Sequence, residues 1–159
     1  GEVVEPVNFN APSQVVIAGH KAAVERAAGI AKAKGAKRAV MLPVSAPFHS
    51  SLLQPAGRRL AEYLADVKFS VPRISVVNNV DVAIVSDPQA IREALARQAC
   101  SPVRWVEVIR SMHASGVRHI AECGPGKVLA GLAKRIVADL QGSAIADPQS
   151  LAQTLEAVK

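Results

Sequence analysis

Short runs of β-branched residues alternate with longer segments of helical periodicity along this chain. Residues 2–9 and 13–18 are typical of strands. Residues 21–34 place apolar side chains at helical spacing, and residues 37–42 predict a third strand. The order strand, strand, helix, strand is the later part of a βαββαβ, ferredoxin-like unit. The first strand and helix of such a unit would lie before Gly1.

The alternation continues through the rest of the chain at a larger spacing. Asp87-Pro88 and Ser101-Pro102 each predict a helix start, because Asp or Ser caps a helix and Pro suits its first position. Alternating strands and helices imply an α/β layer with parallel strands, and we expect the tail from Gly142 to be peripheral. The helices are expected at residues 51–64, 87–98, 103–113 and 127–140, and the strands at residues 74–77 and 117–122.

We therefore expect an α/β protein with two incomplete parts. Residues 1–43 are the remainder of a small, ferredoxin-like α+β subdomain. Residues 44–159 belong to a larger subdomain built on a parallel sheet with helices.

The composition weighs against several classes of protein. A net charge of +6 and a pI of about 9.8 first bring nucleic-acid binding to mind. The basic residues are dispersed along the predicted helices, however, and none form a run interleaved with aromatic side chains. A basic face also suits an acidic protein or a phosphorylated cofactor. No apolar run approaches the roughly 20 residues of a membrane span. Cys100 and Cys123 make neither a disulfide framework nor a metal site, and we expect two buried thiols.

The segment Pro43-Val44-Ser45-Ala46-Pro47-Phe48-His49-Ser50 carries the first candidate for chemistry. It joins a predicted strand to a predicted helix, a place where loops present functional side chains. Histidine is the side chain whose unperturbed pKa, about 6.5, suits proton transfer near neutral pH. A loop histidine packed for structure remains the alternative at this point.

Three other stretches have the same character: residues 8–19, 76–80 and 122–129. In this order around Ser-Ala-Pro-Phe-His, the chain resembles the malonyl-CoA:acyl carrier protein transacylases of fatty acid synthesis, and more loosely the acyltransferase domains of polyketide synthases. The nucleophilic serine of that family lies in a Gly-His-Ser-x-Gly elbow, which does not occur in this chain. We expect the chain to be the C-terminal half of a longer transacylase.

The resemblance implies a hydrolase-like α/β fold and an acyl-serine mechanism. It gives His49 the role of general base, oriented by the backbone carbonyl of Gln98. It implies that Phe48 favours malonyl by filling space and that Asn10 faces the substrate. The residues themselves leave other roles open: a plain helix end for Gln98, core packing for Phe48 and turn capping for Asn10.

The resemblance further implies a cytoplasmic, monomeric transferase with malonyl-CoA and acyl carrier protein as its partners. The coenzyme A thioester is a substrate, and no cofactor, metal, membrane or nucleic acid is expected. The serine, the oxyanion-hole donors and a carboxylate-binding arginine belong to the family's other half, so we expect this chain alone to be inactive. A non-catalytic, carrier-binding α/β module is the competing hypothesis.

Overall fold

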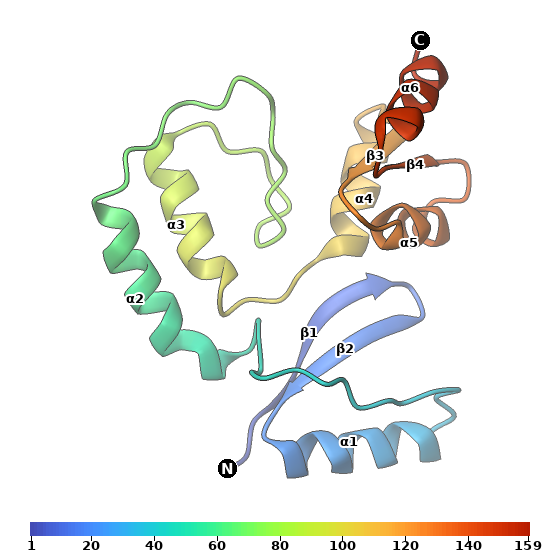
Figure 1. The fold of residues 1–159 in the computed structure, drawn as a ribbon. Coiled ribbons are helices and arrows are strands. Elements are labelled where there is room, and N and C mark those ends of the chain that lie inside the picture. Colours follow the sequence, from blue (N-terminus) through green and yellow to red (C-terminus); the bar gives the residue numbers. More distant parts are fainter. The chain divides into compact units, whose positions relative to one another are not determined.

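The computed structural model describes residues 1–159, which form an α/β fold with two small sheets and six α-helices (Figure 1). The elements follow in the order β1 (Val4–Ala11), β2 (Gln14–Gly19), α1 (Lys21–Ala33), the 3₁₀ turn η1 (Ser51–Leu53), α2 (Gln54–Ala65), α3 (Pro88–Gln98), α4 (Trp105–Ala114), β3 (His119–Cys123), α5 (Val128–Ile136), β4 (Gln141–Ile145) and α6 (Pro148–Ala157).

The contacts divide the chain into two compact units. The first unit holds residues 1–9 and 15–104, and the second holds residues 10–14 and 105–159. The subdomain boundary expected after residue 43 is not tested by these units and stays a prediction.

The first unit begins with the two strands and the helix that the sequence predicts. β1 and β2 pair in a two-stranded sheet, and the two residues between them allow only an antiparallel hairpin. At the start of α1, the backbone N–H of His20 donates to the carbonyl of Val3 at 2.9 Å. The backbone N–H of Val3 in turn donates to Nδ1 of His20, also at 2.9 Å. These two bonds tie the helix start to the residue before β1.

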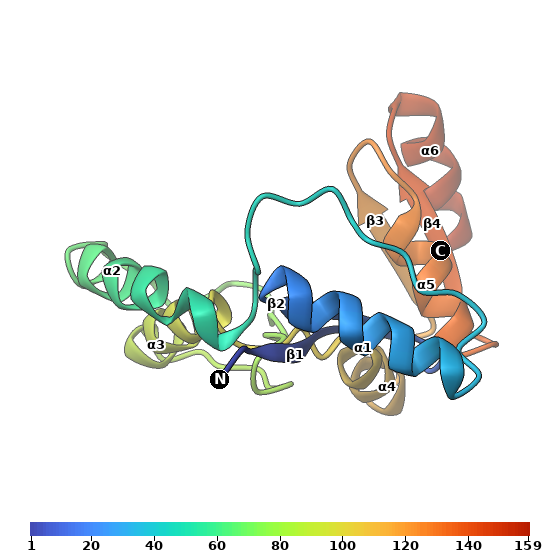
Figure 2. The ribbon, with the colours of Figure 1, turned by 90° about the horizontal axis from the view of Figure 1, so that it is seen from below.

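The third strand, predicted at residues 37–42, does not form. The chain between α1 and η1 runs as a loop (Figure 2). Val40, Met41 and Leu42 are 50–56% exposed. A strand needs a neighbour to pair its N–H and C=O groups, and no strand pairs with this segment. The strand predicted at residues 74–77 is also wrong: only one isolated antiparallel bridge, Val77 to Ile84, remains of it.

Helices α2 and α3 pack together in the first unit. The predicted helix from Ser51 is present, with its first turn as η1. Asp87 caps α3 as expected, because its side chain accepts from the backbone N–H of Ala90 at 2.8 Å. Gly57 of α2 is buried, and a Cβ built on it would lie 3.2 Å from Sγ of Cys100. The missing side chain therefore lets the two helices approach closely just beyond the end of α3.

The second unit has a parallel sheet at its centre. β3 and β4 pair from His119 with Gln141 to Cys123 with Ile145. Its core is the buried cluster of Ile109, Ala133 and Leu140, with partly buried neighbours around it: Trp105, Val117, Ile120, Ile136 and Val137.

The tail from Gly142 is not peripheral, which corrects the sequence-based expectation. It supplies β4 and then α6, whose start is a capping box between Asp147 and Ser150. Helix α5 is correspondingly shorter than predicted and ends at Ile136.

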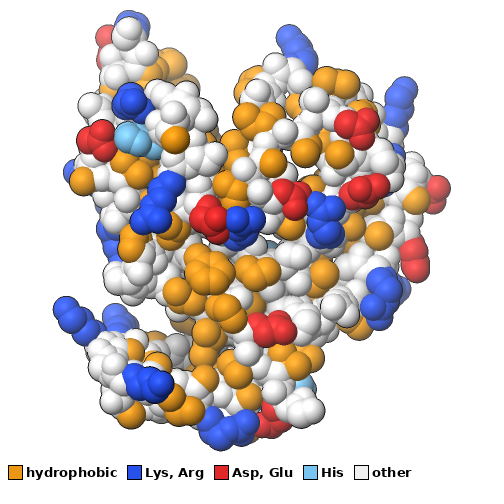
Figure 3. All heavy atoms as spheres, turned by 180° about the vertical axis from the view of Figure 1, so that it is seen from behind, with side chains coloured by type: hydrophobic (Ala, Val, Ile, Leu, Met, Phe, Trp, Pro, Cys, Tyr) orange, Lys and Arg blue, Asp and Glu red, His pale blue; other side chains and the backbone are white.

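Three further observations bear on the classes of protein considered above. No helix has the length and apolarity to cross a membrane. Cys100 is half-buried, but Cys123 is exposed, so the expectation of two buried thiols is wrong for Cys123. On the face drawn in Figure 3, Lys and Arg side chains are scattered among acidic and hydrophobic ones and form no single basic stripe.

Candidate active site

His49 lies in a tight turn directly before η1, and its backbone has φ of +64°. This left-handed conformation costs a non-glycine residue roughly 1–2 kcal/mol. The turn is held from within by Ser50, which is 1% exposed and whose hydroxyl donates to the carbonyl of Pro47 at 2.6 Å. Strained residues of this kind cluster at functional sites, where the surrounding structure determines their conformation.

The ring of His49 is bonded to the end of α3. Its Nδ1 lies 2.9 Å from the backbone carbonyl oxygen of Gln98. A carbonyl oxygen only accepts, so Nδ1 carries a proton, and in the neutral ring Nε2 then keeps its lone pair. Gln98 is the last residue of α3, and the final carbonyls of a helix have no partner within it. The structure therefore brings His49 and Gln98 into contact, and the atom that accepts from His49 belongs to the main chain of Gln98.

A short loop restrains the end of α3. Asn78 organises this loop, because its Oδ1 accepts from the backbone N–H groups of Val80 at 3.1 Å and Asp81 at 2.7 Å. Asp81 then pairs with Arg97 at 2.5 Å, one residue before Gln98. The carboxylate of Asp81 is thus bound to an arginine.

Strand β1 contacts the chain on both sides of the His49–Gln98 bond. Beyond Gln98, the backbone N–H of Val103 donates to the carbonyl of Val7 at 2.8 Å. Beyond His49, both the backbone N–H and the hydroxyl of Ser51 donate to the Glu5 carboxylate at 2.7 Å. These two bonds, the backbone one first, hold the pKa of Glu5 below its usual value.

The Glu5–Ser51 contact is the part of the site that sequence patterns do not predict. The two residues are 46 positions apart, and neither belongs to a local pattern that signals the other. Only the folded arrangement of β1 beside η1 reveals the pair.

The two predicted substrate-contact residues have different surroundings. The side chain of Phe48 is 52% exposed, so it does not fill a core in this structure. Asn10 is half-buried near the end of β1 and falls in the second unit. Their roles towards a substrate stay predictions.

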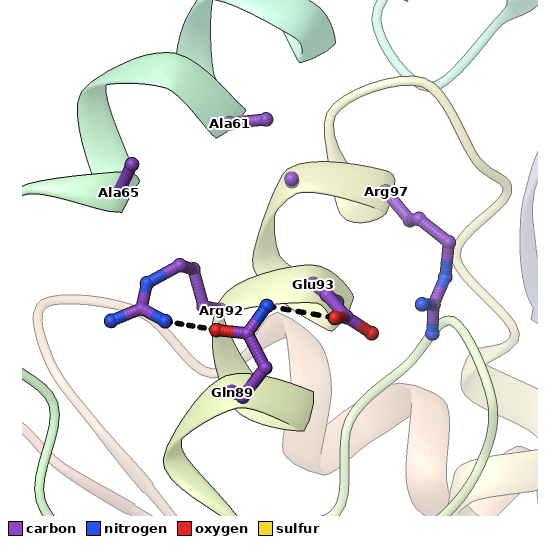
Figure 4. Close-up of a pocket in the computed structure, with 7 residues that line it drawn as sticks. Ala61, Ala65, Gln89, Arg92, Glu93 and Arg97 are labelled. Carbon is purple, nitrogen blue, oxygen red and sulfur yellow. Dashed lines mark hydrogen bonds between the residues drawn. The ribbon is translucent and has the colours of Figure 1, made fainter.

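One groove of the first unit does not have His49 in its lining. Residues of α2 and α3 line this space of about 610 Å³ (Figure 4): Ala61, Ala65, Gln89, Arg92, Glu93, Ala96 and Arg97. Arg92 is engaged by the carbonyls of Leu64 at 2.8 Å and Val67 at 3.2 Å, and by the Gln89 side chain. It also stacks over Phe69, 5.3 Å from the ring centre. Arg97 is paired as described above, so the charged groups of this groove are occupied by structural contacts.

No group of three or more His, Cys, Asp or Glu side chains in residues 1–159 is arranged to hold a metal ion. Two other histidines make structural contacts. His113 lies 3.3 Å from Asp139, and Nε2 of His119 lies 2.8 Å from the hydroxyl of Ser143.

The Gly124-Pro125-Gly126 turn is not a phosphate loop. Glu122 already occupies the N-terminus of α5, because its carboxylate accepts from the backbone N–H of Ala130 at 2.9 Å. An anion there would face this carboxylate, so the glycines serve the turn itself.

No family model matches the chain, but related proteins do. Malonyl CoA-acyl carrier protein transacylase of Escherichia coli strain K12 is 55% identical over 156 residues, which are 98% of this chain and 50% of that protein. The crystal structure of acyl-carrier-protein S-malonyltransferase from Burkholderia pseudomallei 1710b is 64% identical, with a TM-score of 0.95 over 98% of this chain and 50% of that one. A type II PKS acyl-carrier protein in complex with its malonyl-transacylase includes a chain 52% identical, with a TM-score of 0.96 over 99% of this chain and 51% of that one.

These matched proteins are acyltransferases. The chain is homologous to the malonyl CoA-acyl carrier protein transacylases, and the resemblance seen in its sequence is thereby confirmed. It spans about half the length of the curated relatives it matches.

Proposed function

We propose that this chain is the base-bearing half of a malonyl CoA-acyl carrier protein transacylase, and that His49 is its general base. The observation that carries the proposal is the 2.9 Å contact between His49 Nδ1 and the Gln98 carbonyl, in a chain homologous to these enzymes over 98% of its length. That contact leaves Nε2 free to take a proton.

The proposed reaction has two halves. A serine outside these 159 residues attacks the malonyl thioester of coenzyme A, and Nε2 of His49 takes the proton of its hydroxyl. The imidazolium then returns that proton to the departing thiolate. In the second half the carrier's phosphopantetheine thiol attacks the malonyl-serine ester, and His49 again takes and returns one proton. The Gln98 carbonyl keeps the ring in one tautomer throughout.

The substrates and partners follow from the same proposal. They are malonyl-CoA and an acyl carrier protein, and the reaction needs no cofactor or metal. The net charge of +6 supports an acidic partner. We place the whole enzyme in the cytoplasm as a monomer. Phe48 is proposed to favour malonyl over branched acyl groups, and Asn10 to contact the substrate.

His49→Ala in the full-length natural protein tests the proposal. Malonyl transfer to the carrier should fall by about 10²–10⁴-fold, the usual contribution of a general base. His113→Ala is the matched control, because His113 contacts only Asp139 among the bonds described above, and its activity should stay within about twofold. Transfer that survives in His49→Ala within about threefold would contradict the proposal.

The isolated 159-residue chain gives a second test. Because no Gly-x-Ser-x-Gly elbow is present, it should form no malonyl adduct by intact mass after exposure to malonyl-CoA. Carrier binding that persists in a full-length protein without any transfer would favour the non-catalytic module instead.

A further inference from the structure

We propose that Glu5 is a positioning residue for His49. The kinetic part of this inference rests on the proposed function, whereas its structural part does not. Both donors of Ser51 point to the Glu5 carboxylate at 2.7 Å, two residues after His49.

The contact between Glu5 and Ser51 consists of two charge-assisted hydrogen bonds. Both bonds have an ionised acceptor, and such bonds are about twice as strong as those between neutral groups. The lowered pKa of Glu5 agrees with this, since its first cause is the bond from the Ser51 backbone. That N–H is also one of the donors at the start of η1 and α2 that have no partner within the helix.

The turn needs such an anchor because His49 is strained. A residue at φ of +64° stays there only when the surrounding contacts over-determine it. The Gln98 carbonyl holds the ring, and the Ser50–Pro47 bond closes the turn on itself. Among these contacts, only Glu5 ties the end of the turn to a strand.

Strand β1 contacts the chain shortly after His49 and shortly after Gln98. Glu5 holds the chain two residues after His49, while Val7 and Phe9 exchange backbone bonds with Val103, five residues after Gln98, at 2.8 and 3.0 Å. Both attachments lie in the first unit. Glu5 therefore sets where the imidazole stands relative to the carbonyl that orients it.

Removal of the carboxylate should loosen the turn without touching the substrate. We expect Glu5→Gln and Glu5→Ala in the full-length protein to lower kcat by about tenfold and to leave KM within about twofold of its wild-type value. A displaced base stabilises the transition state less, whereas binding of the substrate in the ground state does not depend on it. Ser51→Ala keeps the backbone N–H and should lose about threefold. Ser51→Thr restores the hydroxyl, and its kcat should exceed that of Ser51→Ala.

Glu2→Gln is the matched control. Glu2 pairs with Arg26 at 2.7 Å, both side chains are well exposed, and neither takes part in the site, so this variant should keep wild-type kinetics.

The Nδ1 proton of His49, followed by NMR in ¹⁵N-histidine-labelled protein, is the second measurement. We expect its signal to broaden or vanish in both Glu5 variants and to persist in Glu2→Gln. Unchanged kcat and an unchanged Nδ1 signal in Glu5→Ala would overturn the inference.

If wild-type protein shows no malonyl transfer, the proposed function fails, and the Nδ1 signal still decides the role of Glu5. If Glu5→Ala does not fold, the comparison of Ser51→Ala with Ser51→Thr decides it.

Discussion

Nδ1 of His49 and the backbone carbonyl oxygen of Gln98 lie 2.9 Å apart, across 49 positions of the chain. The acceptor is neutral, so it fixes the tautomer of the imidazole while stabilising the imidazolium less than a carboxylate does. It is also a main-chain atom at a helix end, where a carbonyl is available without any particular side chain.

The Gln98 side chain should therefore matter little to catalysis. In Gln98→Ala the carbonyl remains at the end of α3, and Ala is the best helix former, so kcat of the full-length protein should change by less than about threefold. Steady-state malonyl transfer measures this. A loss of tenfold or more would mean that the amide side chain itself acts in the reaction.

His49 and His20 should be opposite tautomers when neutral. Nδ1 of His49 donates to a carbonyl, whereas Nδ1 of His20 accepts from the backbone N–H of Val3 at 2.9 Å. Long-range ¹H–¹⁵N spectra of the neutral rings distinguish the two forms in one sample. The same tautomer at both residues would refute this assignment.

Local signals in the sequence predict much of this fold. Asp87-Pro88 locates the start of α3, and apolar spacing locates α1, because caps and periodicity act within a few residues. The strands predicted at residues 37–42 and 74–77 fail for the opposite reason. A β-branched run becomes a strand only beside another strand, which no local pattern specifies.

The same limit applies to the site. The His49–Gln98 pair is predicted through a family resemblance and not from residue patterns alone. Glu5 and Ser51 carry no signal at all, because their contact depends on how β1 lies beside η1. Strand β4 is not predicted, since its five residues, Gln-Gly-Ser-Ala-Ile, lack the β-branched run that marks a strand.

Glu5 should make stability depend on pH in the acidic range. The pKa of Glu5 in the folded protein lies below the ordinary value of 4.5. Its contribution to the free energy of unfolding is therefore fully present above about pH 4.5 and is lost as the pH falls through the lower, folded pKa. The difference in unfolding free energy between wild type and Glu5→Gln should be about 1 kcal/mol at pH 7 and should shrink as the pH falls below 4.5.

Urea denaturation between pH 3 and 7 measures that difference. Asp147 also has a lowered pKa, caused first by the backbone bond from Ser150, but it is present in both proteins and its effect cancels. A difference that is constant over this range would contradict the assignment to Glu5.

Gly19 should tolerate no side chain. A Cβ there would lie 2.1 Å from the carbonyl oxygen of Val3, a backbone atom that also accepts from His20. Gly19→Ala should cost about 1–3 kcal/mol of unfolding free energy by urea denaturation. Gly29→Ala is the control, since nothing lies within 4 Å of its Cβ in α1, and it should gain about 0.5–1 kcal/mol. Equal stabilities of the two variants would show that the Val3 contact is not rigid.

The C-terminal residues should be required for the second unit to fold. Truncation after Leu140 removes β4 and α6, which leaves the backbone groups of β3 without their only partner strand. It also uncovers Ala130 of α5, against which Gly142 packs closely enough that a Cβ would lie 3.2 Å from its carbonyl oxygen. Amide exchange of His119–Cys123 should then become fast, while amides of α2 and α3 in the first unit stay protected.

Removal of Val158 and Lys159 alone, beyond the end of α6, should leave the exchange of the β3 amides unchanged. Protected β3 amides after truncation at Leu140 would mean that α4 and α5 suffice to hold that strand.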